Sequence, residues 1–229
     1  MRAYRRNANM NKSRRLIINT QYFLHGIKVV FVRPKRVFKV LKNFFYDFKY
    51  TRSFLGVPLN NQNDIVGFTQ TTSTEYAVLE KLFSNVSIQT HDVIVDVGCG
   101  KGRVLAWLMH KKIPNKVIGV EVDPTVASET KKRMRHYKQI EIVTGDISEE
   151  AFPLDGTIFY LFNPFGEFVM RKFIKKIENN LLGRRVLNNR FLIVYYNCAH
   201  LNVFEENPIW KIKVCGDLDG LPAAIINSS

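Results

Sequence analysis

Cysteine is scarce in this 229-residue chain, which contains only Cys99, Cys198 and Cys215. An odd number of cysteines cannot pair completely within one molecule, and Cys99 stands between two glycines. The count argues against a disulfide-stabilised secreted domain. We therefore expect reduced thiols and a cytoplasmic protein.

Long hydrophobic runs are also missing. The longest apolar stretch near the N-terminus, residues 16–32, is interrupted by Asn19, Gln21, His25 and Lys28. A helix that crosses a bilayer needs about 20 predominantly apolar residues. We therefore expect no membrane span and no secretory signal, although the chain could still lie at the periphery of a membrane.

Acidic residues are nearly absent from the first part of the chain. Residues 1–52 contain 14 Lys or Arg and one acid, Asp47, a net charge of +13, whereas residues 53–229 contain 20 bases and 19 acids, a net +1. We divide the chain into a basic N-terminal extension, residues 1–55, and a nearly neutral domain, residues 56–229. The segregated basic block favours an anionic partner, either nucleic acid or an acidic membrane surface.

Residues 35–54 carry apolar side chains at the spacing of an amphipathic helix. Val37, Leu41, Phe44 and Phe48 recur at intervals of four, three and four residues, and lysines occupy other faces. Three interpretations are open: a lid that packs on the domain, a helix that binds a membrane surface, and a nucleic-acid-binding helix.

The stretch of residues 92–103 organises the rest of the chain. Val93–Val97 is mostly β-branched and apolar, which predicts a buried strand, and residues 104–109 predict a helix. Between them lie three glycines at alternate positions, Gly98, Gly100 and Gly102. Glycines let main-chain N–H groups approach a ligand closely. A dinucleotide fingerprint would place a third glycine at position 103, which is Arg, so we disfavour a nicotinamide dehydrogenase.

Three consecutive predicted strands end in acids. Asp96 lies in the first, Glu121 near the end of residues 116–123, and Asp146 near the end of residues 139–147. Glu121 follows Asp96 by 25 residues, close to the distance at which doubly wound nucleotide-binding domains place a carboxylate against ribose hydroxyls. Because parallel strands share one carboxyl edge, the three side chains should line one crevice.

Two further strands are predicted at residues 157–166 and 190–196. The first stretch contains Asn163, Pro164 and Phe165 near its end. Three residues at the end of the second strand could line a pocket for a substrate: Tyr195, Tyr196 and Asn197. They could equally be two core tyrosines and a turn asparagine.

Hydroxyl groups cluster before a helix predicted over residues 77–83. Those of Thr71 and Thr72 could reach into the ligand pocket, and Ser73 or Thr74 could cap the helix.

The stretch VDVGCGKG resembles motif I of the class I S-adenosylmethionine-dependent methyltransferases. With GVEVD, LFNPFG and VYYN it looks like a small bacterial group of that superfamily without assigned substrates. The resemblance implies an α/β fold: a doubly wound, mostly parallel, seven-stranded Rossmann-like sheet. An antiparallel C-terminal hairpin, expected at residues 210–214 and 223–227, would close it, and a helical extension would precede it.

The resemblance also implies that the cofactor is S-adenosylmethionine and its product S-adenosylhomocysteine. In the superfamily the glycine loop and its acid hold the methionine part, which here implies Asp96, Gly98, Cys99, Gly100 and Gly102. The resemblance further implies that Glu121 and Val122 bind the ribose and that Asp146 and Ile147 bind the adenine. Asn163 borders both cofactor and acceptor, and no metal is implied.

Asn163-Pro164-Phe165 resembles the (Asp/Asn)-Pro-Pro-(Tyr/Phe) motif of amino-group methyltransferases, in which an oxygen accepts an N–H of the target and a ring stacks beside it. One proline is missing here, so Phe165 stands one place early. We expect transfer by in-line displacement to the nitrogen of a protein lysine or a small amine. An RNA base and a polysaccharide intermediate also remain open as acceptors. The alternative is a non-catalytic module that binds the cofactor and docks on membrane or nucleic acid through its extension.

Overall fold

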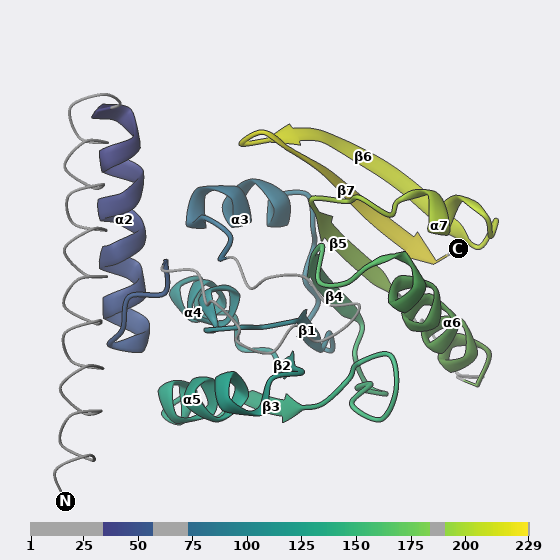
Figure 1. The fold of residues 1–229 in the computed structure, drawn as a ribbon, viewed down its shortest axis with the longest axis horizontal. Helices are drawn as coiled ribbons and strands as arrows, with labels where there is room; N and C mark the ends of the chain where they lie inside the picture. Colours follow the sequence, from purple (N-terminus) through teal and green to yellow (C-terminus); the bar gives the residue numbers. More distant parts are fainter. Residues whose placement is uncertain (1–33, 57–72, 184–190, 229) are drawn as a thin grey trace, which may run out of the picture. The chain divides into compact units, whose positions relative to one another are not determined.

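The protein is described here by a computed structural model of residues 34–56, 73–183 and 191–228. Its centre is a seven-stranded sheet with helices on both faces (Figure 1). The strands are β1 Ile94–Val97, β2 Val117–Glu121, β3 Ile140–Thr144, β4 Ile158–Phe162, β5 Leu192–Tyr196, β6 Trp210–Leu218 and β7 Leu221–Ser228. The helices are α2 Pro34–Thr51, α3 Tyr76–Phe83, α4 Arg103–His110, α5 Pro124–Met134, α6 Glu167–Gly183 and α7 Asn202–Glu205.

The sheet has the order β3-β2-β1-β4-β5-β7-β6. Strands β1 to β5 run parallel to one another, and β7 is antiparallel to both β5 and β6. The predicted mostly parallel sheet with an antiparallel C-terminal pair is therefore confirmed. The order reverses between β1 and β4, and a crevice at such a switch point is where open α/β sheets bind ligands.

The central strands owe their place to continuous apolar runs. All residues of β1, β2 and β5 are buried, as expected for parallel strands that helices cover on both faces. Strand β6 instead has only its first residue, Trp210, buried and is largely exposed, which suits an edge strand. Asp219 and Gly220 join it to β7 with left-handed φ angles of 58° and 88°, the geometry of a tight hairpin turn.

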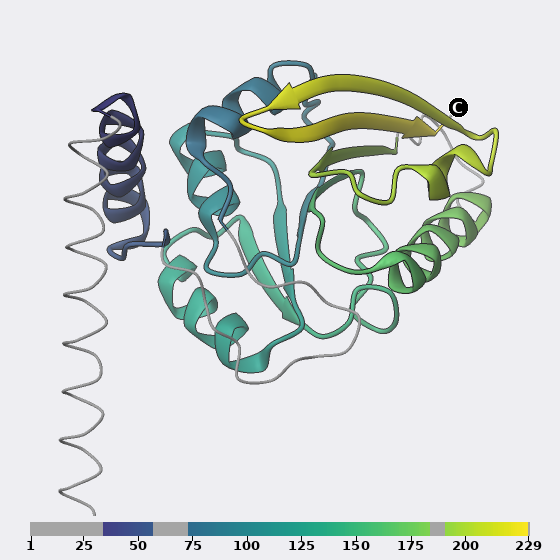
Figure 2. The ribbon, with the colours of Figure 1, turned by 45° about the horizontal axis from the view of Figure 1, so that its top comes forward.

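Two hydrophobic clusters fix the helices on the sheet. One contains Phe159, Phe173 and Phe191 and joins the sheet to α6 and α7. The other contains Tyr76, Trp107 and neighbouring strand residues, and it joins the opposite face to α3 and α4. Figures 1 and 2 both show α3, α4 and α5 on one face and α6 and α7 on the other.

The chain divides into two compact units, Met1–Asn43 and Phe44–Ser229. The larger unit thus begins earlier than the predicted boundary after residue 55. The reason is Asp47, a residue of α2 that is completely buried in the larger unit and paired with Arg103. Residues 1–33 of the basic extension lie outside the described ranges.

Helix α2 buries an unexpected face. Its predicted apolar stripe is exposed within the larger unit, where Phe44 and Phe48 keep 49% and 53% of their surface accessible. The buried positions are instead Asp47 and Thr51. The described residues therefore do not form a lid that packs on the domain through its apolar stripe. None of the helices in the described ranges has the length and apolarity that crossing a bilayer requires.

Candidate functional site

The loop after β1 has the backbone of a ligand cradle. Gly98 and Gly102 adopt left-handed φ angles of 70° and 87°, which side chains rarely tolerate. Among the described residues, a Cβ atom at Gly98 would meet only Pro164 Cβ, at the ordinary contact distance of 3.4 Å. A Cβ atom at Gly102 would lie 2.8 Å from Met134 Cε, so that glycine lets the loop pack on α5.

Asp96 is the most unusual group of the site. Its side chain lies in β1 and is 2% exposed, and Oδ2 has no hydrogen-bond partner among the described residues. Burial, together with the nearby Glu121 carboxylate, raises the pKa of Asp96 to about 8. A buried acceptor without a donor is costly, so this oxygen suits a ligand that brings a cationic N–H group.

Glu121 braces the glycine loop from the end of β2. Its Oε2 accepts a hydrogen bond from Gly100 N at 2.8 Å, and Oε1 accepts one from Asp123 N at 3.0 Å. Burial raises the pKa of this carboxyl as well. Each oxygen keeps a second lone pair for a ligand hydroxyl.

The third acid, Asp146, lies at the same sheet edge. Gly145 N donates to Glu121 O at 3.0 Å, which ties the ends of β3 and β2 together. Asp146 is half-buried, and its Oδ1 accepts bonds from the amide and hydroxyl of Ser148 at 2.7 and 2.8 Å. Its neighbour Ile147 belongs to the hydrophobic core. The structure thus places the three predicted carboxylates at successive strand ends.

A small cavity opens where β1 and β4 end. Besides the glycine loop it is lined by Ser73, Thr74, Asp96, Arg103, Tyr160 and Phe162. Asp96 and Tyr160 are register partners on the neighbouring strands β1 and β4. Sequence reasoning passed over Tyr160 and Phe162, although their spacing of two residues in a strand places both on one face.

The hydroxyl cluster before α3 behaves differently from the prediction. Thr71 and Thr72 lie outside the described residues. Ser73 and Thr74 do not cap α3, whose N-cap residue is Glu75. Instead Thr74 Oγ1 lies 2.6 Å from Tyr160 Oη, and Ser73 Oγ donates to Leu55 O at 2.9 Å. The two hydroxyl residues therefore join the cavity wall to other elements.

Asn163 follows β4 with a left-handed φ of 37°, and its side chain is half-buried. Phe165, which was expected to stack on an acceptor, is 1% exposed. Its ring packs edge-on against Phe173 of α6, with 5.6 Å between the ring centroids, so in this structure Phe165 lies in the core and its proposed role stays a prediction. Among the described residues, Tyr160 and Phe162 are the aromatic residues that line the cavity. Phe162 is half-buried, and its ring centroid lies 4.7 Å from that of Tyr196.

The predicted acceptor-pocket residues are divided between core and edge. Tyr195 is buried, and its hydroxyl donates to Asn163 Oδ1 at 3.5 Å while accepting from His200 N at 3.3 Å. Tyr196 is buried too and donates to Leu218 O, and burial raises its pKa to about 12. Asn197 is half-buried, with a left-handed φ of 51°. Both tyrosines are thus core residues, and Tyr195 supports Asn163.

Comparison with known proteins explains this arrangement. Residues 94–181 match the sequence family described as "Methyltransferase domain". An rRNA adenine N-6-methyltransferase of Lysinibacillus sphaericus is 28% identical over 145 residues, 62% of this chain and 54% of that protein. Another protein of that name, from Limosilactobacillus reuteri, is 26% identical over 121 residues, 53% of this chain and 47% of that protein. The predicted resemblance to the class I S-adenosylmethionine-dependent methyltransferases is therefore confirmed.

The chain spans about half the length of the relatives it matches. The fold likeness extends to a putative methyltransferase, yhhF, from Escherichia coli, with a TM-score of 0.52 at 18% identity, over 69% of this chain and 88% of that one. At such low identity the likeness shows the fold alone.

The residues of this site fit S-adenosylmethionine, the cofactor that the resemblance implies. The amino group of the methionine part is a cationic donor, which matches the buried Asp96 Oδ2. Glu121 offers acceptor oxygens for the ribose hydroxyls. Within residues 34–56, 73–183 and 191–228 the structure gathers no cluster of three acidic, His or Cys side chains that could hold a metal.

Proposed function

We propose that this methyltransferase methylates an amino nitrogen, and that the acceptor is the exocyclic amino group of an adenine in RNA. The observation that carries the transferase activity is the buried Asp96 Oδ2, which faces no donor in the described residues and lines the cavity beside the glycine loop. The names of the relatives supply the acceptor class. With RNA as acceptor, the proposed place of action is the cytoplasm.

Asn163 is proposed to orient the acceptor. When bound, S-adenosylmethionine supplies an activated methyl group and its leaving group, so the chain must align the nitrogen and let one proton depart. The Asn163 carboxamide oxygen can accept one N–H of that nitrogen, and the Tyr195 hydroxyl holds this oxygen from behind. Phe162 offers a ring face on which a base can stack.

The charge of the acceptor distinguishes adenine from lysine. An adenine amino group is neutral at pH 7, and a carboxamide is enough to position it. A lysine ammonium, with an ordinary pKa near 10.4, must first lose a proton. The net charge of +13 on residues 1–52 also favours a polyanionic partner.

The test is incubation of the purified chain with methyl-labelled cofactor and a bacterial lysate, followed by separation into RNA, protein and small molecules. We expect label in RNA, recovered as N6-methyladenine after nuclease digestion, and none with the Asn163→Gly variant. Label confined to the protein or small-molecule fraction would contradict RNA as the acceptor and would favour a protein lysine or a small amine instead. Measurable cofactor binding without labelling of any fraction would instead support the non-catalytic binding module.

A further inference from the structure

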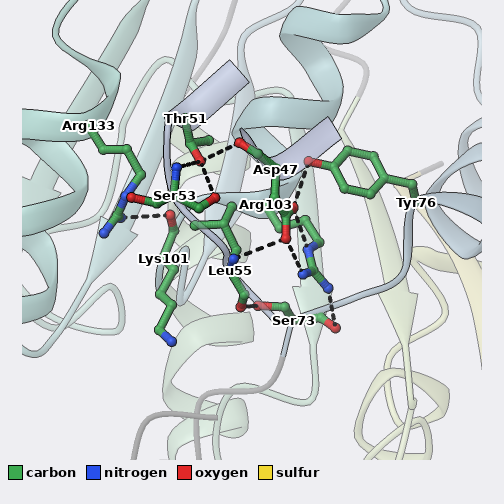
Figure 3. Close-up of polar contacts among 9 residues, drawn as sticks. All are labelled: Asp47, Thr51, Ser53, Leu55, Ser73, Tyr76, Lys101, Arg103 and Arg133. Atoms are coloured by element: carbon green, nitrogen blue, oxygen red, sulfur yellow. Dashed lines mark hydrogen bonds and ion pairs between the residues drawn. The ribbon is translucent and has the colours of Figure 1, made fainter. Parts of the chain in front are cut away.

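A buried ion pair lies directly beside the glycine loop. Arg103, the first residue of α4, is 5% exposed and its partner Asp47 is completely buried. Arg103 Nε donates to Asp47 Oδ1 at 3.0 Å and Nη2 to Oδ2 at 2.6 Å, a bidentate pair (Figure 3). A buried pair of this kind repays its desolvation only when the remaining polar atoms are satisfied.

The carboxylate is satisfied, whereas the guanidinium retains donors. Asp47 also accepts from Tyr76 Oη and Leu55 N, each at 3.0 Å (Figure 3). Nη1 of Arg103, in contrast, makes one long contact within the described residues, to Ser73 O at 3.5 Å. A guanidinium has five N–H donors, so one edge of Arg103 remains for a ligand.

Arg103 lines the same cavity as Asp96. The cavity wall therefore carries a cation with spare donors and a buried carboxylate oxygen that has no donor among the described residues. The methionine part of S-adenosylmethionine is a zwitterion with an ammonium and a carboxylate. Asp96 complements the ammonium, and a cation with spare donors in the wall of the same cavity complements the carboxylate.

We infer that Arg103 binds the carboxylate of the cofactor through Nη1 and that Asp47 of α2 is the positioning residue that holds the guanidinium in place. This inference rests on the proposed function, since it assumes the use of S-adenosylmethionine. Arginine suits the task because its planar fork can serve Asp47 along one edge and a second carboxylate along the other. The last turns of α2 thereby become part of the cofactor site.

Calorimetry of the full chain with three ligands tests the inference. S-adenosylhomocysteine carries both charged groups, its decarboxylated analogue lacks only the carboxylate, and 5′-methylthioadenosine lacks the whole amino acid. The unmodified protein should bind the decarboxylated analogue about ten to a hundred times more weakly than S-adenosylhomocysteine, the range of a charged hydrogen bond. Equal affinities for these two ligands would overturn the inference even if no variant folds.

Variants identify the residue. Arg103→Lys should lose about tenfold or more in affinity for S-adenosylhomocysteine and less than threefold for the decarboxylated analogue. Asp47→Asn should weaken the same discrimination to a smaller degree. The matched control is Arg133→Lys, because Arg133 Nη1 also bonds to the glycine loop, at Lys101 O, but its side chain does not line the cavity.

The two failures can be told apart because no acceptor is present. If Arg103→Lys loses affinity equally for all three ligands, Arg103 has only a structural role. That result overturns this inference but leaves the proposed function standing. If the unmodified chain binds none of the three ligands, the proposed function fails as well.

Discussion

At the scale of single residues, the site contains two carboxyl groups, Asp96 and Glu121, whose pKa values are raised by burial. The Asp96 carboxyl has a pKa raised from 3.8 to about 8, chiefly by burial and then by Glu121. The folded state therefore binds this proton more tightly than the unfolded chain does. It follows that the ligand-free protein should lose stability as pH rises from about 4 through 8, where the folded-state carboxyl loses its proton.

Asp96→Asn should stabilise the ligand-free protein above pH 8 while weakening binding of S-adenosylhomocysteine. The neutral amide removes a buried charge, and an increase of about 1–2 kcal/mol would raise the melting temperature by about 2–8 °C. Scanning calorimetry from pH 6 to pH 9 measures this, and the pH dependence of the variant should be flatter.

The matched control is another buried acid, Asp92, whose oxygens accept bonds from Gln89 N and Thr157 Oγ1. Asp92→Asn should lower the melting temperature because it replaces a satisfied acceptor with an amide. If Asp96→Asn is as destabilising as Asp92→Asn, the buried Asp96 carboxylate is not a cost that the ligand relieves.

Asn163→Gly isolates the proposed orientation of the acceptor. The left-handed φ of 37° suits glycine, so the fold should persist while the carboxamide is lost. We expect kcat for RNA methylation to fall about 100-fold or more, with the affinity for S-adenosylhomocysteine within twofold of the original. Lys112→Gly, at an exposed position with a φ of 55°, is the control and should leave kcat unchanged. Similar kcat values for both variants would remove Asn163 from the mechanism.

At the scale of elements, α2 shows where sequence reasoning stops. The 3.6-residue periodicity predicted the helix correctly, but the apolar stripe suggested the wrong buried face. Asp47 is buried because of Arg103, 56 residues further along the chain, and no local pattern reports such a partner. Likewise, the motif placed Phe165 beside the acceptor, whereas packing on Phe173 holds it in the core.

The local signals were sufficient for the sheet. Runs of β-branched residues predicted the parallel strands, and the glycines directly after β1 predicted the cofactor loop. Both could be predicted because strand and loop formation depend mainly on residues that are adjacent in sequence. The acids at strand ends could be placed together because parallel strands share one edge. The role of Arg103 could not be predicted in this way. The sequence showed only that an arginine stands where a dinucleotide fingerprint would have its third glycine.

The same helix offers a stability test. Asp47→Ala should cost about 3–5 kcal/mol of unfolding free energy, since it leaves the Arg103 charge buried without its partner. Phe48→Ala, on the exposed face, should cost less than about 1 kcal/mol. Urea denaturation measures both. Comparable small losses would show that the last turns of α2 do not anchor in the larger unit.

At the scale of the whole molecule, charge and chemistry are separated along the chain. The basic residues concentrate in residues 1–52, whereas the proposed cofactor groups lie in the nearly neutral remainder, with Asp47 as the link between the two. Removal of different lengths from the N-terminus should therefore remove different functions.

Deletion of residues 1–33 should leave the affinity for S-adenosylhomocysteine within about twofold but weaken RNA binding and reduce its salt dependence, because fewer phosphates are neutralised. Deletion of residues 1–55 should weaken cofactor binding clearly more than the shorter deletion does, since Asp47 and the last turns of α2 no longer hold Arg103. Calorimetry and RNA titrations at several salt concentrations measure both. Loss of cofactor binding on the shorter deletion would show that residues 1–33 belong to the pocket.

The position of β7 has a consequence for how the chain acquires its sheet. Strand β7 follows β6 in sequence but lies between β5 and β6, and in the described sheet β6 pairs with β7 alone. Until β7 is in place, β6 has no partner strand in this sheet and β5 has one unpaired side. We therefore expect Leu221–Ser228 to join β5 and β6 in a single folding step, and loss of β7 to leave both strands unpaired.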